Sequence, residues 1–162
     1  MSHPFRLVVA AAVVAGVAMG AGFAAAESAG VTVYESQDSF DDVRQGVSDA
    51  IVNRGFVIDY EGRIGDMLNR TAADVGADKT VYEHADFLQF CSATLSRAAM
   101  EADPANIAFC PYVVFVYELA DQKGTTHVGF RHLQGGGSAD STKALDAVNA
   151  LLDAIAKEAA GQ

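Results

Sequence analysis

Two cysteines, Cys91 and Cys110, are the residues best suited to chemistry in this chain of 162 residues. Such a pair can form a structural disulfide, act as a redox couple, or bind a metal or haem through thiolate. The sequence contains neither the Cys-x-x-Cys spacing of redox enzymes nor the Cys-x-x-Cys-His motif that attaches haem covalently. A disulfide that closes a loop of about 20 residues is the leading prediction, and the other roles stay open.

A second candidate set lies at alternate positions of one segment: His127, Gly129 and Arg131. On an extended strand these residues share a face, so His127 could ligate a non-covalent haem, Gly129 would leave room for a flat ring, and Arg131 could meet a propionate. These three are candidate ligand-binding residues. The competing interpretation is that Val128 and Phe130 face the core and that His127 and Arg131 line the solvated side, because simple alternation produces the same pattern.

His84 is a further candidate ligand-binding residue, because Glu83 and Asp86 lie beside it. Three polar residues on a strand edge are more often surface than ligands, so no metal site is predicted. His127 and His132 are an odd number of positions apart and would point to opposite faces of a regular strand. The sequence also has no Gly-x-Ser-x-Gly elbow and no Walker loop, so no catalytic residue is assigned.

The N-terminus has the features of an export signal. Arg6 precedes an apolar run that extends from Leu7 to Ala26 and ends in small residues before Glu27. This pattern predicts a signal peptide over residues 1–26, cleaved after Ala26, and the alternative is a retained anchor. The remaining residues, 27–162, would form a single domain in the periplasm or outside the cell, where cysteine pairs are usually oxidised.

The charge balance limits the partners. The chain has 21 acidic and 11 basic side chains and a formal net charge of −10. Repulsion from phosphates argues against nucleic acid, and it also argues against anionic membrane surfaces once the signal peptide is removed.

Hydrophobic periodicity predicts alternating strands and helices along residues 31–160. Ser39 with Asp42 predicts a helix start, and Gly55 its end. The run Val113–Tyr117 is continuously apolar, which is typical of a central strand. Strands are expected at 31–34, 56–60, 81–91 (irregular near 85–86), 108–119 and 125–133, and helices at 40–54, 64–76, 92–101 and 145–159.

This order predicts an α+β fold in which helices pack on one face of a mixed or mainly antiparallel sheet. The last two strands form a hairpin around Asp121–Gly124. Gly135–Gly137 is interpreted as a joint before the final helix.

Several of these segments resemble the bacterial domain of unknown function 302 family. They are Ser39-Phe40-Asp41-Asp42, Asn53-Arg54-Gly55-Phe56, Pro111–Glu118 and Val128-Gly129-Phe130-Arg131. The resemblance implies a small α+β fold that often self-associates, here as a homodimer, and it supplies no catalytic residues. The segments around Cys91 and Cys110 look like an exported subgroup that carries two cysteines.

Together these observations predict an exported, acidic, non-catalytic module that binds an unidentified small ligand, a protein or a second copy of itself. The alternative is a haem-binding or redox-active periplasmic protein that uses His127 or Cys110.

Overall fold

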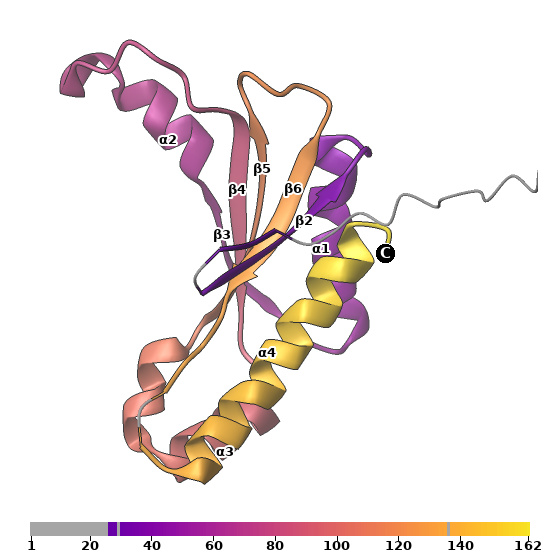
Figure 1. The fold of residues 1–162 in the computed structure, drawn as a ribbon, viewed down its shortest axis with the longest axis vertical. Helices are drawn as coiled ribbons and strands as arrows, with labels where there is room; N and C mark the ends of the chain where they lie inside the picture. Colours follow the sequence, from indigo (N-terminus) through magenta and orange to yellow (C-terminus); the bar gives the residue numbers. More distant parts are fainter. Residues whose placement is uncertain (1–25, 29, 136) are drawn as a thin grey trace, which may run out of the picture.

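The computed structural model describes residues 26–28, 30–135 and 137–162 (Figure 1). The predicted signal peptide lies outside the described residues except for Ala26. Within the described part, no helix has the length and apolar character needed to cross a membrane.

The described chain alternates strands and helices. In chain order the elements are β1 (Ala26–Ser28), β2 (Val31–Ser36), α1 (Phe40–Asn53), β3 (Ile58–Arg63), α2 (Ile64–Thr71), the 3-10 helix η1 (Ala73–Val75), β4 (Tyr82–Phe90), α3 (Ala93–Ala102), the 3-10 helix η2 (Pro104–Phe109), β5 (Tyr112–Leu119), β6 (Thr126–Arg131) and α4 (Ala139–Ala159).

The strands form one antiparallel sheet in the order β1-β2-β6-β5-β4-β3. The predicted α+β class is confirmed, and all pairings are antiparallel. β5 lies inside the sheet between β6 and β4, as its continuous apolar run predicted.

Local sequence determines where α1 begins and ends. The Ser39 hydroxyl accepts a hydrogen bond from the Asp42 backbone N–H, as an N-cap does, and it donates one to the Asp42 carboxylate. At the other end Gly55 adopts a φ of +81°, a left-handed conformation that glycine adopts without strain. Both predicted helix boundaries are confirmed.

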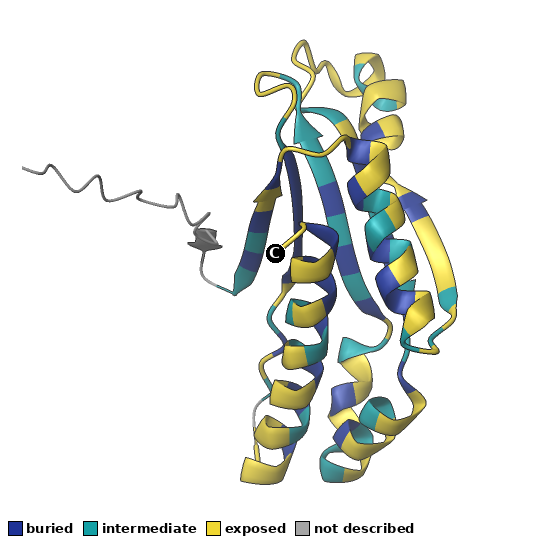
Figure 2. Ribbon diagram, turned by 90° about the vertical axis from the view of Figure 1, so that its right-hand side faces the viewer, coloured by how far each residue is buried: buried dark blue, intermediate teal, exposed yellow. Residues whose placement is uncertain are grey.

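Helices α1 and α4 cover one face of the sheet. Their inward stripes include Val43, Val47, Leu145 and Ile155, and these pack on buried side chains of β4, β5 and β6. Figure 2 shows buried residues along the inner side of both helices. In Figure 1, α2 and α3 stand at opposite ends of the molecule, and α3 packs against the start of α4.

Several predicted element boundaries are wrong. The final helix, expected from residue 145, starts at Ala139, and the helix expected over 64–76 ends at Thr71. The strand expected over 56–60 spans Ile58–Arg63. The strand expected from residue 108 starts only at Tyr112, because Asp103 caps a 3-10 helix that begins at Pro104 and includes residue 108. The irregularity of β4 lies between Tyr82 and His84 rather than near residues 85–86.

Candidate functional site

The sheet face away from α1 and α4, here called the open face, carries an ordered array of side chains. In the middle row, Val33, Gly129, Phe115, Phe87 and Gly62 lie side by side across β2, β6, β5, β4 and β3. The neighbouring row on the α2 side runs Glu35, His127, Tyr117 and Ala85. On the other side of the middle row lie Val31, Arg131, Val113, Gln89 and Tyr60.

Two glycines flatten the open face. A Cβ added at Gly129 would collide with the Thr32 carbonyl and crowd the ring of Phe115, and a Cβ added at Gly62 would collide with the ring of Phe87. The phenyl rings therefore lie over neighbouring strands rather than standing upright. The two rings thus fill the space above Gly129 and Gly62, and the middle row is apolar from β2 to β3.

A groove of about 400 Å³ crosses the α2 end of the open face. Side chains on β2, β4, β5 and α2 line it: Val31, Val33, Ile64, Tyr82, Phe115 and Tyr117. Next to the groove, the segment from Ile64 to Val81, here called the α2 arm, presents further exposed apolar side chains. These are Ile64, Met67, Leu68, Val75 and Val81.

His127 is on the open face, as alternation predicted, but it is not solvated. Its residue is 7% exposed, and its ring stacks on Tyr117 with the centroids 4.6 Å apart. Nδ1 lies 4.0 Å from a carboxylate oxygen of Glu35, and the buried Nε2 has no hydrogen-bond partner among the described residues. The expectation that His127 lines the solvated side is therefore wrong, whereas Val128 and Phe130 face the core as expected.

The structure places the predicted haem set on one face but leaves no slot between its members. The space above Gly129, which was expected to admit a flat ring, is occupied by the Phe115 side chain. A planar cofactor at this position would have to displace that ring. Arg131 lies further along the same face, at the edge of a separate cleft.

The residues around His84 do not converge. His84 stacks on Phe40 at the start of α1, with ring centroids 5.0 Å apart. Glu83 instead pairs with Lys123 at 3.1 Å, and Asp86 pairs with the Arg44 Nε at 2.8 Å. Among the described residues, no group of three metal-ligating side chains comes together.

Cys91 and Cys110 do come together, at the junction of β4 with α3 and of η2 with β5. Their Sγ atoms lie 2.7 Å apart, and the Ser96 hydroxyl is 3.6 Å from the Cys110 sulfur. Burial, together with the neighbouring Cys110 and Asp59, raises the pKa of Cys91 to about 12. The two cysteines are free thiols in the structure. Redox exchange and metal binding need a thiolate, which the raised pKa disfavours at Cys91.

The geometry can be compared with known proteins. A family model described as domain of unknown function DUF302 matches residues 32–159, which is most of the chain. The chain belongs to the DUF302 family. The resemblance in the sequence segments is thereby confirmed. A search of the curated proteins gave no match.

A solved structure supports the DUF302 fold. The chain is similar to a crystal structure of an uncharacterized conserved DUF302 protein from Bacillus stearothermophilus, with a TM-score of 0.68 and 12% sequence identity. The similarity covers 82% of this chain and 99% of the other. At this identity it shows the shared fold.

Sequence reasoning missed the open face as a surface, although a signal for it was present. In β4 and β5, apolar residues occupy both alternating sets of positions: Phe87 faces one side and Leu88 the other, and Phe115 and Val116 do the same. Gly62 in β3 was also an indication, because a glycine inside a strand often marks a close approach by a neighbour.

Proposed function

We propose that this DUF302 domain is an exported, non-catalytic interaction module that forms a homodimer through the open face of its sheet. The supporting observation is that β5 has the sequence of a strand buried on both faces, whereas only one of its faces is covered by helices. Val114 and Val116 are fully buried, and Phe115 and Tyr117 are half-buried. In a sheet that exposes one face to water, the outward positions are usually polar.

The groove on the open face and the α2 arm beside it are complementary in shape. The groove between Val33 and Ile64 is an apolar hollow, and the α2 arm beside it is an apolar protrusion. In a two-fold dimer every contact occurs twice, so a hollow and a protrusion on the same surface can be satisfied together. A contiguous exposed apolar patch of this kind marks an interaction site more often than a surface left in water.

Charge favours the same surface. With a net charge of −10, two copies repel each other unless they meet where the charge is low. Across the three rows of paired positions on the open face, Glu35 is the only carboxylate and Arg131 the only guanidinium. The open face is therefore close to neutral, and burying it against a second copy avoids most of the repulsion.

The cysteine pair fits an exported module. We include in the proposal a Cys91–Cys110 disulfide formed in an oxidising compartment, which would tie the end of β4 to the start of β5. The short distance between the two sulfurs and the unfavourable setting for a thiolate support this role.

The experiment compares matched lysine variants by sedimentation equilibrium over a wide range of protein concentrations. Val33→Lys and Leu68→Lys place a charge on the groove and on the α2 arm, whereas Val52→Lys places the same charge on an exposed position of α1. The expected result is a dimer for the mature protein and for Val52→Lys, and a monomer for the other two variants. A mature protein that is monomeric at the highest concentration would refute the proposal, as would equal association of all four proteins. Circular dichroism at low concentration shows whether each variant is folded.

A further inference from the structure

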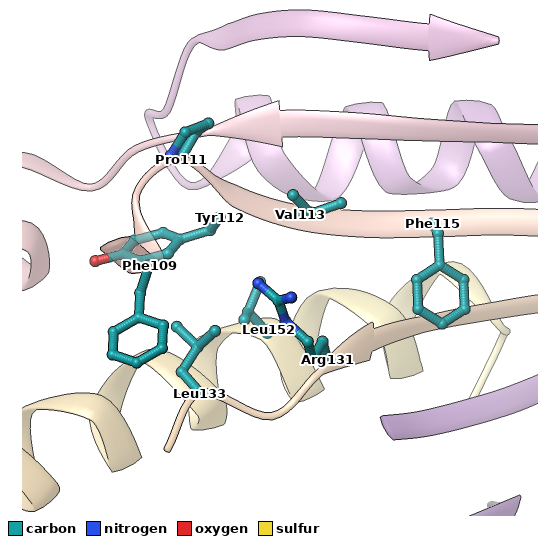
Figure 3. Close-up of a pocket in the computed structure, with 8 residues that line it drawn as sticks. All are labelled: Phe109, Pro111, Tyr112, Val113, Phe115, Arg131, Leu133 and Leu152. Carbon is teal, nitrogen blue, oxygen red and sulfur yellow. The ribbon is translucent and has the colours of Figure 1, made fainter. Parts of the chain in front are cut away.

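A second hollow lies at the other end of the open face, where β5 and β6 separate. Their ladder ends at the pair Val114 and Phe130, and the next residues, Val113 and Arg131, are not paired with each other. A cleft of about 250 Å³ opens between the two strands, and Leu152 of α4 forms part of its lining (Figure 3). This cleft passes through the plane of the sheet toward the helix layer.

The cleft is apolar with one exception. Phe109, Val113, Leu133 and Leu152 contribute hydrocarbon surface. The Tyr112 hydroxyl already has a hydrogen-bond partner, because it lies 3.0 Å from the Ser96 Oγ. Arg131 is the only charged side chain in the lining.

Arg131 and Arg70 are the two arginines of the described residues that pair with no carboxylate, and of the two only Arg131 lines a cleft with an apolar lining. Arg44, Arg54 and Arg97 each pair with a carboxylate in the structure. In a chain with almost twice as many acidic as basic residues, Arg131 has no such partner among the described residues. Arg131 is exposed, and in the view of Figure 3 its side chain appears beside Leu133 and Leu152 of the cleft lining.

We propose that this cleft binds a small monocarboxylic acid with an apolar body, and this proposal goes beyond the dimer. The guanidinium of Arg131 would pair with the carboxylate, a geometry for which arginine is suited. The hydrocarbon body would lie between Phe109 and Leu133 and rest on Leu152. At about 30 Å³ for one water, the cleft has the volume of about eight waters, which suits an acid of about eight carbon atoms.

Because Arg131 is the only charged side chain that lines the cleft, it indicates the charge of the ligand. Phosphate groups are usually held by several donors or by a helix N-terminus, and a second charge on the ligand would have no partner in this cleft. An uncharged apolar molecule would make no use of the guanidinium of Arg131, which is exposed at the rim of the cleft. A monocarboxylate satisfies both the apolar lining and the guanidinium.

The test is isothermal titration calorimetry of the mature protein with octanoate. Acetate supplies the charge without the body, and octan-1-ol supplies the body without the charge. Octanoate is expected to bind at least tenfold more tightly than either compound, because the charge-assisted contact and the buried hydrocarbon each contribute. Equal affinity for octanoate and octan-1-ol would overturn the proposal, and so would the absence of octanoate binding at millimolar concentration.

Variants locate the binding. Arg131→Gln should weaken octanoate binding at least tenfold, and Val113→Phe should also weaken it by filling the cleft. Arg97→Gln removes a surface cation on α3 and should bind octanoate like the unmodified protein. Unchanged binding in both Arg131→Gln and Val113→Phe would contradict the assignment. The same titration on monomeric Leu68→Lys separates this result from the dimer proposal, since the α2 arm does not line the cleft.

Discussion

The two faces of β5 carry similar side chains and have different surroundings. Val114 and Val116 pack under α1 and α4 and are fully buried, whereas Val113, Phe115 and Tyr117 lie on the open face and are only half-buried. The two sets of β5 side chains are therefore similar in type but lie in different environments, and their types alone do not show which set is covered. The difference teaches that the apolar pattern of a strand does not show by itself which of its faces the chain covers; under the proposed dimer, a second copy would cover the face of β5 that the helices leave open.

The two faces also differ in shape. On the covered side, branched residues of the helices fill the spaces between the side chains of the sheet. On the open side, Phe115 lies over Gly129 and Phe87 over Gly62, so the surface is level. A level surface suits broad contact with another protein surface more than enclosure of a small molecule. Two hollows interrupt this surface: the groove at the α2 end and the cleft where β5 and β6 separate.

The largest predicted effect tests the difference in burial. Phe130→Ala removes a ring that is 1% exposed on the covered face and should lower the free energy of unfolding by about 3–5 kcal/mol. Phe87→Ala also removes a phenyl ring, but from the open face. It should lower the free energy of unfolding by roughly half as much at concentrations where the protein is monomeric. Urea unfolding at low protein concentration measures both values. Equal losses would mean that the two faces are equally buried in the single chain.

The next prediction concerns the proposed Cys91–Cys110 disulfide, which would join the end of β4 to the start of β5. In oxidising buffer, replacing Cys91 and Cys110 together by alanine should lower the free energy of unfolding by about 3 kcal/mol, because a disulfide restricts the unfolded chain. The unmodified protein should then show no titratable thiols without reductant. Two thiols that react in the native, oxidised preparation would contradict the disulfide.

A smaller effect concerns the border of the covered face, where β2 meets α4. Tyr34 donates a hydrogen bond to Asp153, and Lys157 pairs with the same carboxylate at 2.8 Å. Burial alone would raise the pKa of Asp153, but these hydrogen bonds and the charge of Lys157 outweigh it and hold the pKa below its usual value. Asp153→Asn should therefore cost about 1 kcal/mol at neutral pH, given the partial exposure of the group.

The lowered pKa of Asp153 determines how the effect of Asp153→Asn changes with pH. A carboxyl group with a lowered pKa in the folded state stabilises the fold above its unfolded pKa and loses that contribution as the pH falls through the folded pKa. The free energy of unfolding of the unmodified protein should exceed that of Asp153→Asn by less as the pH is lowered from 7 toward 3. Urea unfolding at each pH measures both values. A difference that grows on acidification would show that the Asp153 carboxylate is not the stabilising form.

Much of the fold could be predicted from local rules, because the information lies in neighbouring residues. The capping pair of Ser39 and Asp42, the left-handed Gly55 and the run Val113–Tyr117 each specify structure within a few positions. The start of β5 was misplaced because the 3-10 helix from Pro104 competes with the extended conformation for the same apolar residues.

The candidate sites were less predictable because they depend on contacts between distant segments. Alternation placed His127 on the correct face but could not show that Tyr117 covers its ring. It also could not show that Phe115 fills the space at Gly129, or that the β5–β6 ladder ends at Val114 beside Arg131. These contacts follow from strand register, which the spacing of residues within one segment does not determine.

The central claim is that a second copy covers the open face, and tryptophan fluorescence tests it most directly. The chain contains no tryptophan, so Phe115→Trp introduces a single reporter on the open face, and Val52→Trp introduces one on the exposed side of α1. As the protein is concentrated from nanomolar to high micromolar, the emission of Phe115→Trp should shift to shorter wavelength while that of Val52→Trp stays constant. An unchanged Phe115→Trp spectrum over the whole range, or equal shifts at both positions, would contradict the claim.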